Sequence, residues 1–199
     1  GAGTGKLTKQ LSAMGLLVTA IEPNDAMRTE GMSYTNGYPL EWRKGSAEAT
    51  GVAKQRYHWV TMASSFHWTD PNRSLPEFAR ILKPQGYFTA MWNPRDLSRS
   101  EFHMRIEKKI YDIAPHIERK SSGSKEYTPH LEETLVSTGH FDPPIFIEAQ
   151  HESCMSIERY LAAWRSVNDI QVQAGDKKWQ RILEMITQET AGLETVVVP

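Results

Sequence analysis

The beginning of the chain alternates a segment with helical spacing and a short apolar run. Leu7, Leu11 and Met14 recur on one helical face, which predicts a first helix over residues 4–14. The apolar run over 16–23 then predicts a strand. A glycine-rich loop, a helix and a strand therefore follow one another within the first 23 residues.

The same alternation continues to residue 93. Asn24 or Asp25 suits the cap of a second helix. In a later helix Pro76 suits the first turn, and Pro84 and Gly86 end it. The elements predicted here are strands over 40–48, 57–65 and 87–93 and a helix over 70–83. Repeated strand and helix with short connections predicts an α/β fold: a Rossmann-like, doubly wound, mostly parallel sheet with helices on both faces.

After Pro94 the pattern becomes mainly helical. We predict helices over 100–114, 129–139, 157–164 and 179–186, and strands over 145–155 and 194–199. The polar stretch 120–126 has linker composition and is expected to be a mobile loop. We therefore expect a single domain over 1–199, with a core over 1–93 and a helical cap with C-terminal strands over 94–199.

The charge and composition of the chain limit the classes of partner that we expect it to bind. Lys and Arg number 23 against 24 acids, a formal net charge of −1, so there is no global electrostatic case for nucleic acid or a membrane surface. The one cysteine, Cys154, and the histidines show no metal-ligand spacing, so no metal is expected. We expect a cytoplasmic protein without an obligate protein partner.

The opening "GAGTGKLT" raises the question of which ligand its glycine loop holds. A P-loop needs a hydroxyl directly after the lysine to bind magnesium, but Leu7 stands there. The dinucleotide turn G-x-G-x-x-G needs a third glycine where Lys6 stands. Glu22 ends the following strand about 20 residues later, where an acid accepts hydrogen bonds from ribose hydroxyls. The loop and Glu22 together indicate a ligand with an adenosine half and leave its identity open.

The ordered set of motifs is more specific than the loop. "GAGTGKLT", "VTAIEPNDAMR", "GSAEATG", "WVTMASSFHWTD" and "EFARILKPQGYFTAMWN" follow one another within residues 1–93. This set resembles the class I S-adenosylmethionine-dependent methyltransferases, in particular the small-molecule branch that includes the trans-aconitate methyltransferases. The resemblance implies S-adenosylmethionine as cofactor and transfer of its methyl group to a small-molecule acceptor.

The resemblance also implies site residues. On the cofactor side, the backbone of the glycine loop approaches the methionine part, and Glu22 takes both ribose hydroxyls. Pro23 and Asn24 flank the adenosine, and Ser46 and Ala47 lie at the adenine edge. Ala63 and Ser64 lie beside the methionine and the reacting methyl. These residues are Gly1, Ala2, Gly3, Glu22, Pro23, Asn24, Ser46, Ala47, Ala63 and Ser64.

On the acceptor side, Phe66, His67 and Trp68 are implied to begin the wall between cofactor and substrate. His67 follows a strand end in the crevice of the sheet and is the candidate catalytic residue. Trp92 and Asn93 end the next strand there and are candidates to bind the acceptor. Arg95 is a candidate to pair with a substrate carboxylate.

The start of the sequence departs from the family's pattern, and this departure leaves alternatives open. Members of the family place a central apolar strand before the glycine loop, and this sequence has none before Gly1. We expect either that the sequence is part of a longer protein or that another segment fills the gap, because unpaired backbone ladders inside a sheet are costly. A cofactor-binding module without turnover and, less favoured, a dinucleotide-binding oxidoreductase remain the alternatives.

Overall fold

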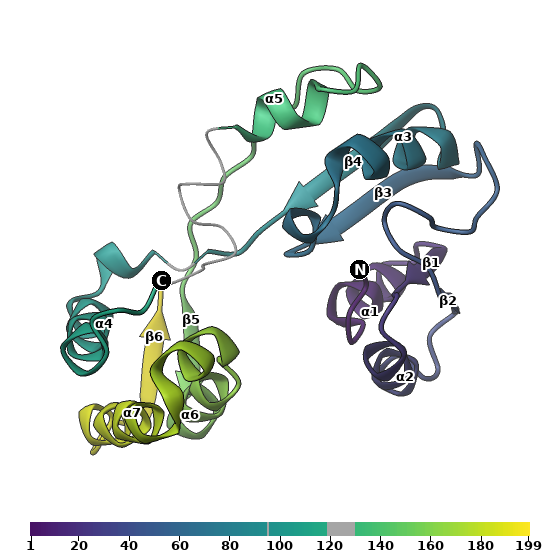
Figure 1. Ribbon diagram of the computed structural model, residues 1–199. Helices are drawn as coiled ribbons and strands as arrows, with labels where there is room; N and C mark the ends of the chain where they lie inside the picture. Colours follow the sequence, from purple (N-terminus) through teal and green to yellow (C-terminus); the bar gives the residue numbers. More distant parts are fainter. Residues whose placement is uncertain (95, 119–129) are drawn as a thin grey trace. The chain divides into compact units, whose positions relative to one another are not determined.

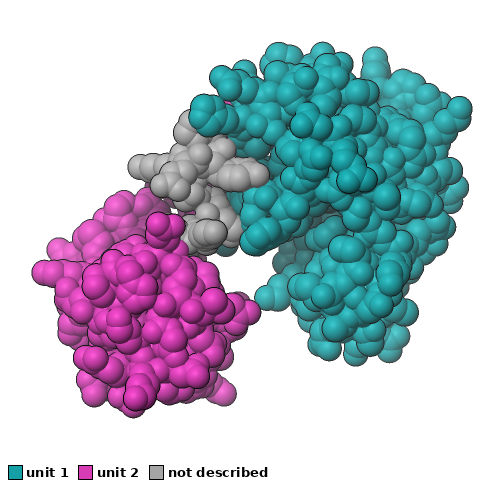
Figure 2. Space-filling view, viewed as in Figure 1, with its two compact units in different colours: residues 1–93, 122–145 teal, residues 94–121, 146–199 magenta. Residues whose placement is uncertain are grey.

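A computed structural model describes residues 1–94, 96–118 and 130–199. Arg95 and the expected loop over 120–126 lie outside these residues. The chain divides into two compact units, residues 1–93 with 122–145 and residues 94–121 with 146–199 (Figure 2). One division falls after Asn93, and residues 130–145 group with the first unit.

The first unit contains parallel strands and helices in alternation (Figure 1). Its elements are α1 (Lys6–Ala13), β1 (Val18–Ile21), α2 (Asp25–Tyr34), β2 (Leu40–Arg43), β3 (Tyr57–Ala63), the 3-10 turn η1 (Phe66–Trp68), α3 (Pro71–Ile81), β4 (Leu82–Met91) and α5 (Leu131–Val136). This pattern agrees with the predicted α/β class.

The strands of the first unit form two separate pairs. β1 runs parallel to β2, and β3 runs parallel to β4, but in the described part of the chain neither pair forms a ladder with the other. The Tyr57 hydroxyl on β3 donates to the Thr19 hydroxyl on β1 at 3.1 Å. The two pairs are thus linked by a side-chain contact, where the sequence predicted a continuous sheet.

Local sequence signals place the helix starts of α2 and α3. The Asn24 side chain accepts from the Met27 amide at 3.0 Å and caps α2, as predicted. Asp70 caps α3 in the same way, and Pro71 takes the first helical position. The expectation that Pro76 lies in the first turn is wrong, since it lies inside α3.

The end of α3 also differs from the prediction. The helix ends at Ile81 and β4 begins at once, so Pro84 and Gly86 lie within the strand and do not end the helix. The strand register is irregular between Tyr57 and Trp59, which face Leu82 and Tyr87. A bulge of this kind accommodates a proline and a glycine that regular pairing would disfavour.

Helix α1 buries a different face from the expected one. Its buried residues are Thr8 and Ser12, while Leu7 and Leu11 are only half-buried and Met14 is 77% exposed. In the described chain β1 pairs only with β2, so little sheet surface is available to cover these apolar side chains. The sheet surface available to cover α1, and not the spacing of its apolar residues, therefore decides which face of the helix is buried.

The second unit packs helices around a small antiparallel sheet. Its elements are η2 (Leu97–Arg99), α4 (Glu101–Ile113), β5 (Ser153–Ser156), α6 (Ile157–Arg165), α7 (Asn168–Glu189) and β6 (Thr195–Val198). β5 is antiparallel to β6 and shorter than the strand predicted over 145–155. Ile145 and Ile147 lie outside it and are each 89% exposed. No helix in the described ranges is long and apolar enough to cross a bilayer.

The core of the second unit lies between α4, α6 and α7. Ile110 and Ile182 are fully buried there beside Trp164, which is 2% exposed. We expect Ile182→Ala to lower the free energy of unfolding by about 2–5 kcal/mol, because the substitution leaves a cavity. Val172 also lies in α7 but is 82% exposed, so Val172→Ala should change it by less than about 0.5 kcal/mol. Urea denaturation followed by circular dichroism measures both, and equal effects would contradict this assignment of the core.

Candidate functional site

A buried carboxylate joins the glycine loop to the end of β1. Glu22 is 5% exposed, and its Oε2 accepts from the Gly3 amide at 2.8 Å while Oε1 accepts from the Asn24 amide at 3.0 Å. Each oxygen keeps acceptor capacity, because an ionised carboxylate offers about four lone-pair sites. The three residues were each expected in the cofactor site, and the structure brings them together.

The glycine loop bonds to the same strand end through its backbone. The amino group of Gly1 and the amide of Ala2 both donate to the Ile21 carbonyl at 2.9 Å. Gly3 and Gly5 have φ values of 58° and 81°, in the left-handed region that favours glycine. The conformation of the loop therefore depends on glycine at these two positions, because a residue with a side chain would be strained there.

The glycine loop also lies against the end of β3. A Cβ placed on Gly1 would lie 3.1 Å from the Ser65 Cβ, which is tighter than an ordinary contact, so a side chain at this position would require Ser65 to shift. Beside Ser65, Ser64 has φ of 47°, and its amide donates to the Met91 carbonyl at 2.8 Å. Such a strained position in a non-glycine residue is typical of functional turns. Ala63, the other expected residue here, is half-buried at the last pair of β3 with β4.

The loop that carries Ser46 and Ala47 is fixed by a group that sequence analysis did not identify. Both residues are half-buried, and this loop ends at Thr50. The Glu77 carboxylate accepts from the Thr50 amide at 3.0 Å and also from its hydroxyl. Arg80 donates to Glu77 through Nε at 2.6 Å and to the Val52 carbonyl through Nη2 at 2.8 Å. In the sequence, the E-x-x-R spacing of Glu77 and Arg80 was the available signal. It does not reveal that Glu77 binds Thr50, which lies 27 residues earlier.

These contacts act on the charge of Glu77. The Arg80 hydrogen bonds, joined by those from Thr50, lower the pKa of the Glu77 carboxyl from 4.5 to about 2 despite the opposing effect of burial. The ion pair therefore favours the ionised carboxylate throughout the neutral range.

The aromatic residues after β3 occupy different environments. Phe66 is 1% exposed and packs on Phe88 in the core, so it offers little surface to a substrate. Trp68 is 81% exposed, with its ring 4.8 Å from the ring of His67. Phe66 thus anchors this turn in the core, while the half-buried His67 and the exposed Trp68 lie nearer the surface.

His67 lies beside Trp92, which follows β4. The Trp92 indole donates from Nε1 to His67 Nδ1 at 3.1 Å. Burial lowers the pKa of the His67 imidazole below its ordinary value of 6.5, so the neutral ring predominates at pH 7. Sequence analysis named both residues but not their contact.

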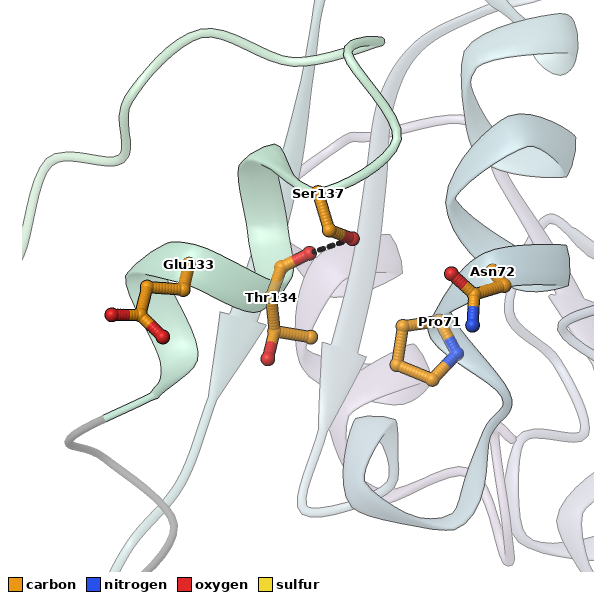
Figure 3. Close-up of a pocket in the computed structure, with 5 residues that line it drawn as sticks. All are labelled: Pro71, Asn72, Glu133, Thr134 and Ser137. Carbon is orange, nitrogen blue, oxygen red and sulfur yellow. Dashed lines mark hydrogen bonds between the residues drawn. The ribbon is translucent and has the colours of Figure 1, made fainter.

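The remaining expected residues are less constrained. Pro23 and Asn93 are exposed, and Arg95 lies outside the described residues. Within the described ranges no group of three His, Cys, Asp or Glu side chains could hold a metal ion. A hollow between α3 and α5 is lined by residues that were not expected in a site (Figure 3): Pro71, Asn72, Glu133, Thr134 and Ser137.

Comparison with known proteins finds a family resemblance in the first part of the chain. Residues 1–90 match the family described as methyltransferase domain. Over these residues the chain is similar to methyltransferases. The predicted resemblance to class I S-adenosylmethionine-dependent methyltransferases is thereby confirmed.

Sequence relatives are also named methyltransferases. An uncharacterised methyltransferase of Mycobacterium bovis is 38% identical over 100 residues, which cover 48% of this chain and 39% of the relative. The chain thus matches well under half the length of that relative. An uncharacterised methyltransferase of Schizosaccharomyces pombe is 25% identical over 193 residues, or 94% of this chain and 71% of the relative.

Solved structures support the fold. A candidate type II methyltransferase from Anaeromyxobacter dehalogenans aligns with a TM-score of 0.62 at 17% identity, covering 100% of this chain and 83% of that one. A candidate methyltransferase from Anabaena variabilis aligns with a TM-score of 0.60 at 17% identity, covering 96% and 77%. The Rossmann-like fold predicted from the sequence is confirmed.

The Glu77 ion pair yields a pH-dependent prediction. Since the pKa of Glu77 falls from 4.5 to about 2 on folding, its stabilisation is complete above about pH 4.5 and is lost as the pH falls toward 2. Glu77→Gln should lower the free energy of unfolding by about 2 kcal/mol at pH 7. The difference from the unchanged protein should shrink between pH 4.5 and 2. Denaturation at a series of pH values tests this, with the exposed Glu132→Gln as control; a pH-independent difference would contradict it.

Proposed function

We propose that this protein transfers the methyl group of S-adenosylmethionine to a small-molecule acceptor, with positioning as its main catalytic device. The observation that supports this most is the buried Glu22 carboxylate, which accepts from the Gly3 and Asn24 amides inside the segment that matches the methyltransferase domain. A buried acid with spare acceptor capacity, beside a loop in which Gly3 and Gly5 take the left-handed conformation, suits a diol-bearing adenosine ligand.

The cofactor would be held by the residues of the first unit. Glu22 would accept from the ribose hydroxyls with Pro23 and Asn24 beside the adenosine, and Ser46 and Ala47 would lie at the adenine edge. The methionine part would lie along the glycine loop and the turn after β3, formed by Gly1, Ala2, Gly3, Ala63 and Ser64. The bound cofactor supplies an activated methyl group on a sulfonium with a neutral thioether as leaving group.

The acceptor would lie at the ends of β3 and β4. His67 and Trp68 follow β3, and Trp92 and Asn93 follow β4, so both groups lie at the carboxyl edge where ligands bind in parallel sheets. Arg95 remains a candidate partner for an acidic acceptor. Holding the nucleophile on axis with the methyl group can supply effective molarities up to roughly 10⁵–10⁸ M.

Titration calorimetry tests the ligand class. We expect S-adenosylmethionine to bind and NAD not to bind, because Lys6 replaces the third glycine of the dinucleotide turn. Binding of NAD alone would overturn the proposal in favour of an oxidoreductase. Labelled methyl transfer into a metabolite extract then tests turnover; tight cofactor binding without any labelled product would favour a non-catalytic binding module.

Glu22→Ala should weaken binding of S-adenosylmethionine by tenfold or more. Each charge-assisted hydrogen bond to a hydroxyl is worth about 1.5–3 kcal/mol, and about 1.4 kcal/mol corresponds to a tenfold change in affinity. Calorimetry measures the effect, and circular dichroism verifies that the variant is folded. Glu30→Ala, an exposed acid in α2, is the matched control and should bind like the unchanged protein. Unchanged affinity in folded Glu22→Ala would remove Glu22 from the site.

A further inference from the structure

The contact between Trp92 and His67 fixes where the imidazole hydrogen lies. An indole Nε1–H can only donate, so His67 Nδ1, at 3.1 Å from it, must accept. A neutral imidazole whose Nδ1 accepts carries its hydrogen on Nε2. The ring is therefore held as one of its two neutral tautomers.

The backbone around the two residues keeps this contact in place. Ala63 and Met91 are the last paired residues of β3 and β4, so η1 and Trp92 leave the sheet from adjacent strands. Phe66 is buried in the core, and its carbonyl accepts from both the amide and the hydroxyl of Thr69, at 3.0 and 2.9 Å. The turn that carries His67 is thus anchored on both sides of the imidazole.

We propose that Trp92 is a positioning residue that holds His67 as the Nε2–H tautomer, so that His67 donates a hydrogen bond to the methyl acceptor and does not remove its proton. This inference rests on the proposed function for the identity of the reaction. The tautomer itself rests only on the geometry of the two side chains.

The tautomer restricts the chemistry of the acceptor. Protonation of Nδ1 would place two hydrogens between the ring and the indole and break their hydrogen bond, whereas Nε2 already carries a hydrogen. No proton passes through His67, and the acceptor's own lone pair forms the bond to the methyl carbon as the carbon–sulfur pair stays on sulfur. The acceptor class that fits is a nucleophile with an available lone pair, such as an oxyanion or an unprotonated nitrogen, and not an alcohol that needs a base.

Nitrogen-15 NMR of protein labelled at histidine tests the tautomer, with the His67 signals assigned by their loss in His67→Gln. We expect Nδ1 of the neutral ring to be unprotonated and Nε2 protonated. In Trp92→Phe the signals should move toward a mixture of the two tautomers. Trp59→Phe removes an indole that donates at 2.9 Å to Thr89 on the adjacent strand, and should leave His67 unchanged.

A hydrogen on Nδ1 in the unchanged protein would overturn the proposal, even if Trp92→Phe failed to fold. An unaltered tautomer in folded Trp92→Phe would also overturn the role of Trp92.

The donor role has a separate kinetic test, labelled methyl transfer from S-adenosylmethionine into the metabolite extract. The amide of His67→Gln can donate in place of Nε2–H but cannot act as a base. We expect it to retain transfer within about tenfold, whereas loss of a general base costs about 10²–10⁴-fold. A loss of the larger size would overturn the donor role. If the unchanged protein binds no S-adenosylmethionine by calorimetry, the proposed function fails, and the NMR result still decides the tautomer.

Discussion

The buried Glu22 carboxylate is the constraint on which the geometry of the first unit depends. A charge at 5% exposure is tolerated only when hydrogen bonds satisfy it, and the Gly3 and Asn24 amides do so. The first amide fixes the loop that leads into α1, and the second fixes the residue that caps α2. One side chain thus sets the position of two helix starts at the end of β1, where the adenosine half of the proposed ligand would lie.

Features that depend on neighbours in the sequence were predictable. The Asn24 cap, the glycine loop and the acid at the strand end follow from short-range backbone chemistry, and the structure has all three. Features that depend on how helices and strands pack on one another were not predictable. The apolar face of α1 was assigned to Leu7, Leu11 and Met14, but burial of Thr8 and Ser12 depends on how much sheet is available to cover the helix.

The same distinction applies to the site. His67 and Trp92 are 25 residues apart and meet because β3 pairs with β4, whereas Thr50 and Glu77 are 27 apart and meet where the loop after β2 contacts α3. The sequence named His67 and Trp92 as separate candidates, since both follow strands. It contained no information on their register, and therefore none on which imidazole nitrogen the indole would contact.

The two halves of the proposed site differ in physical character. The cofactor half uses backbone amides and one buried charge, which suit a ligand of fixed structure. The acceptor half, as far as the structure describes it at η1 and the end of β4, presents the neutral His67 ring, the exposed Trp68 and the Trp92 indole. A neutral donor can orient a nucleophile and leave its lone pair available, whereas a cation would stabilise that lone pair and lower its reactivity. With the methyl group already activated on sulfur, such a surface needs only to align an acceptor that arrives deprotonated.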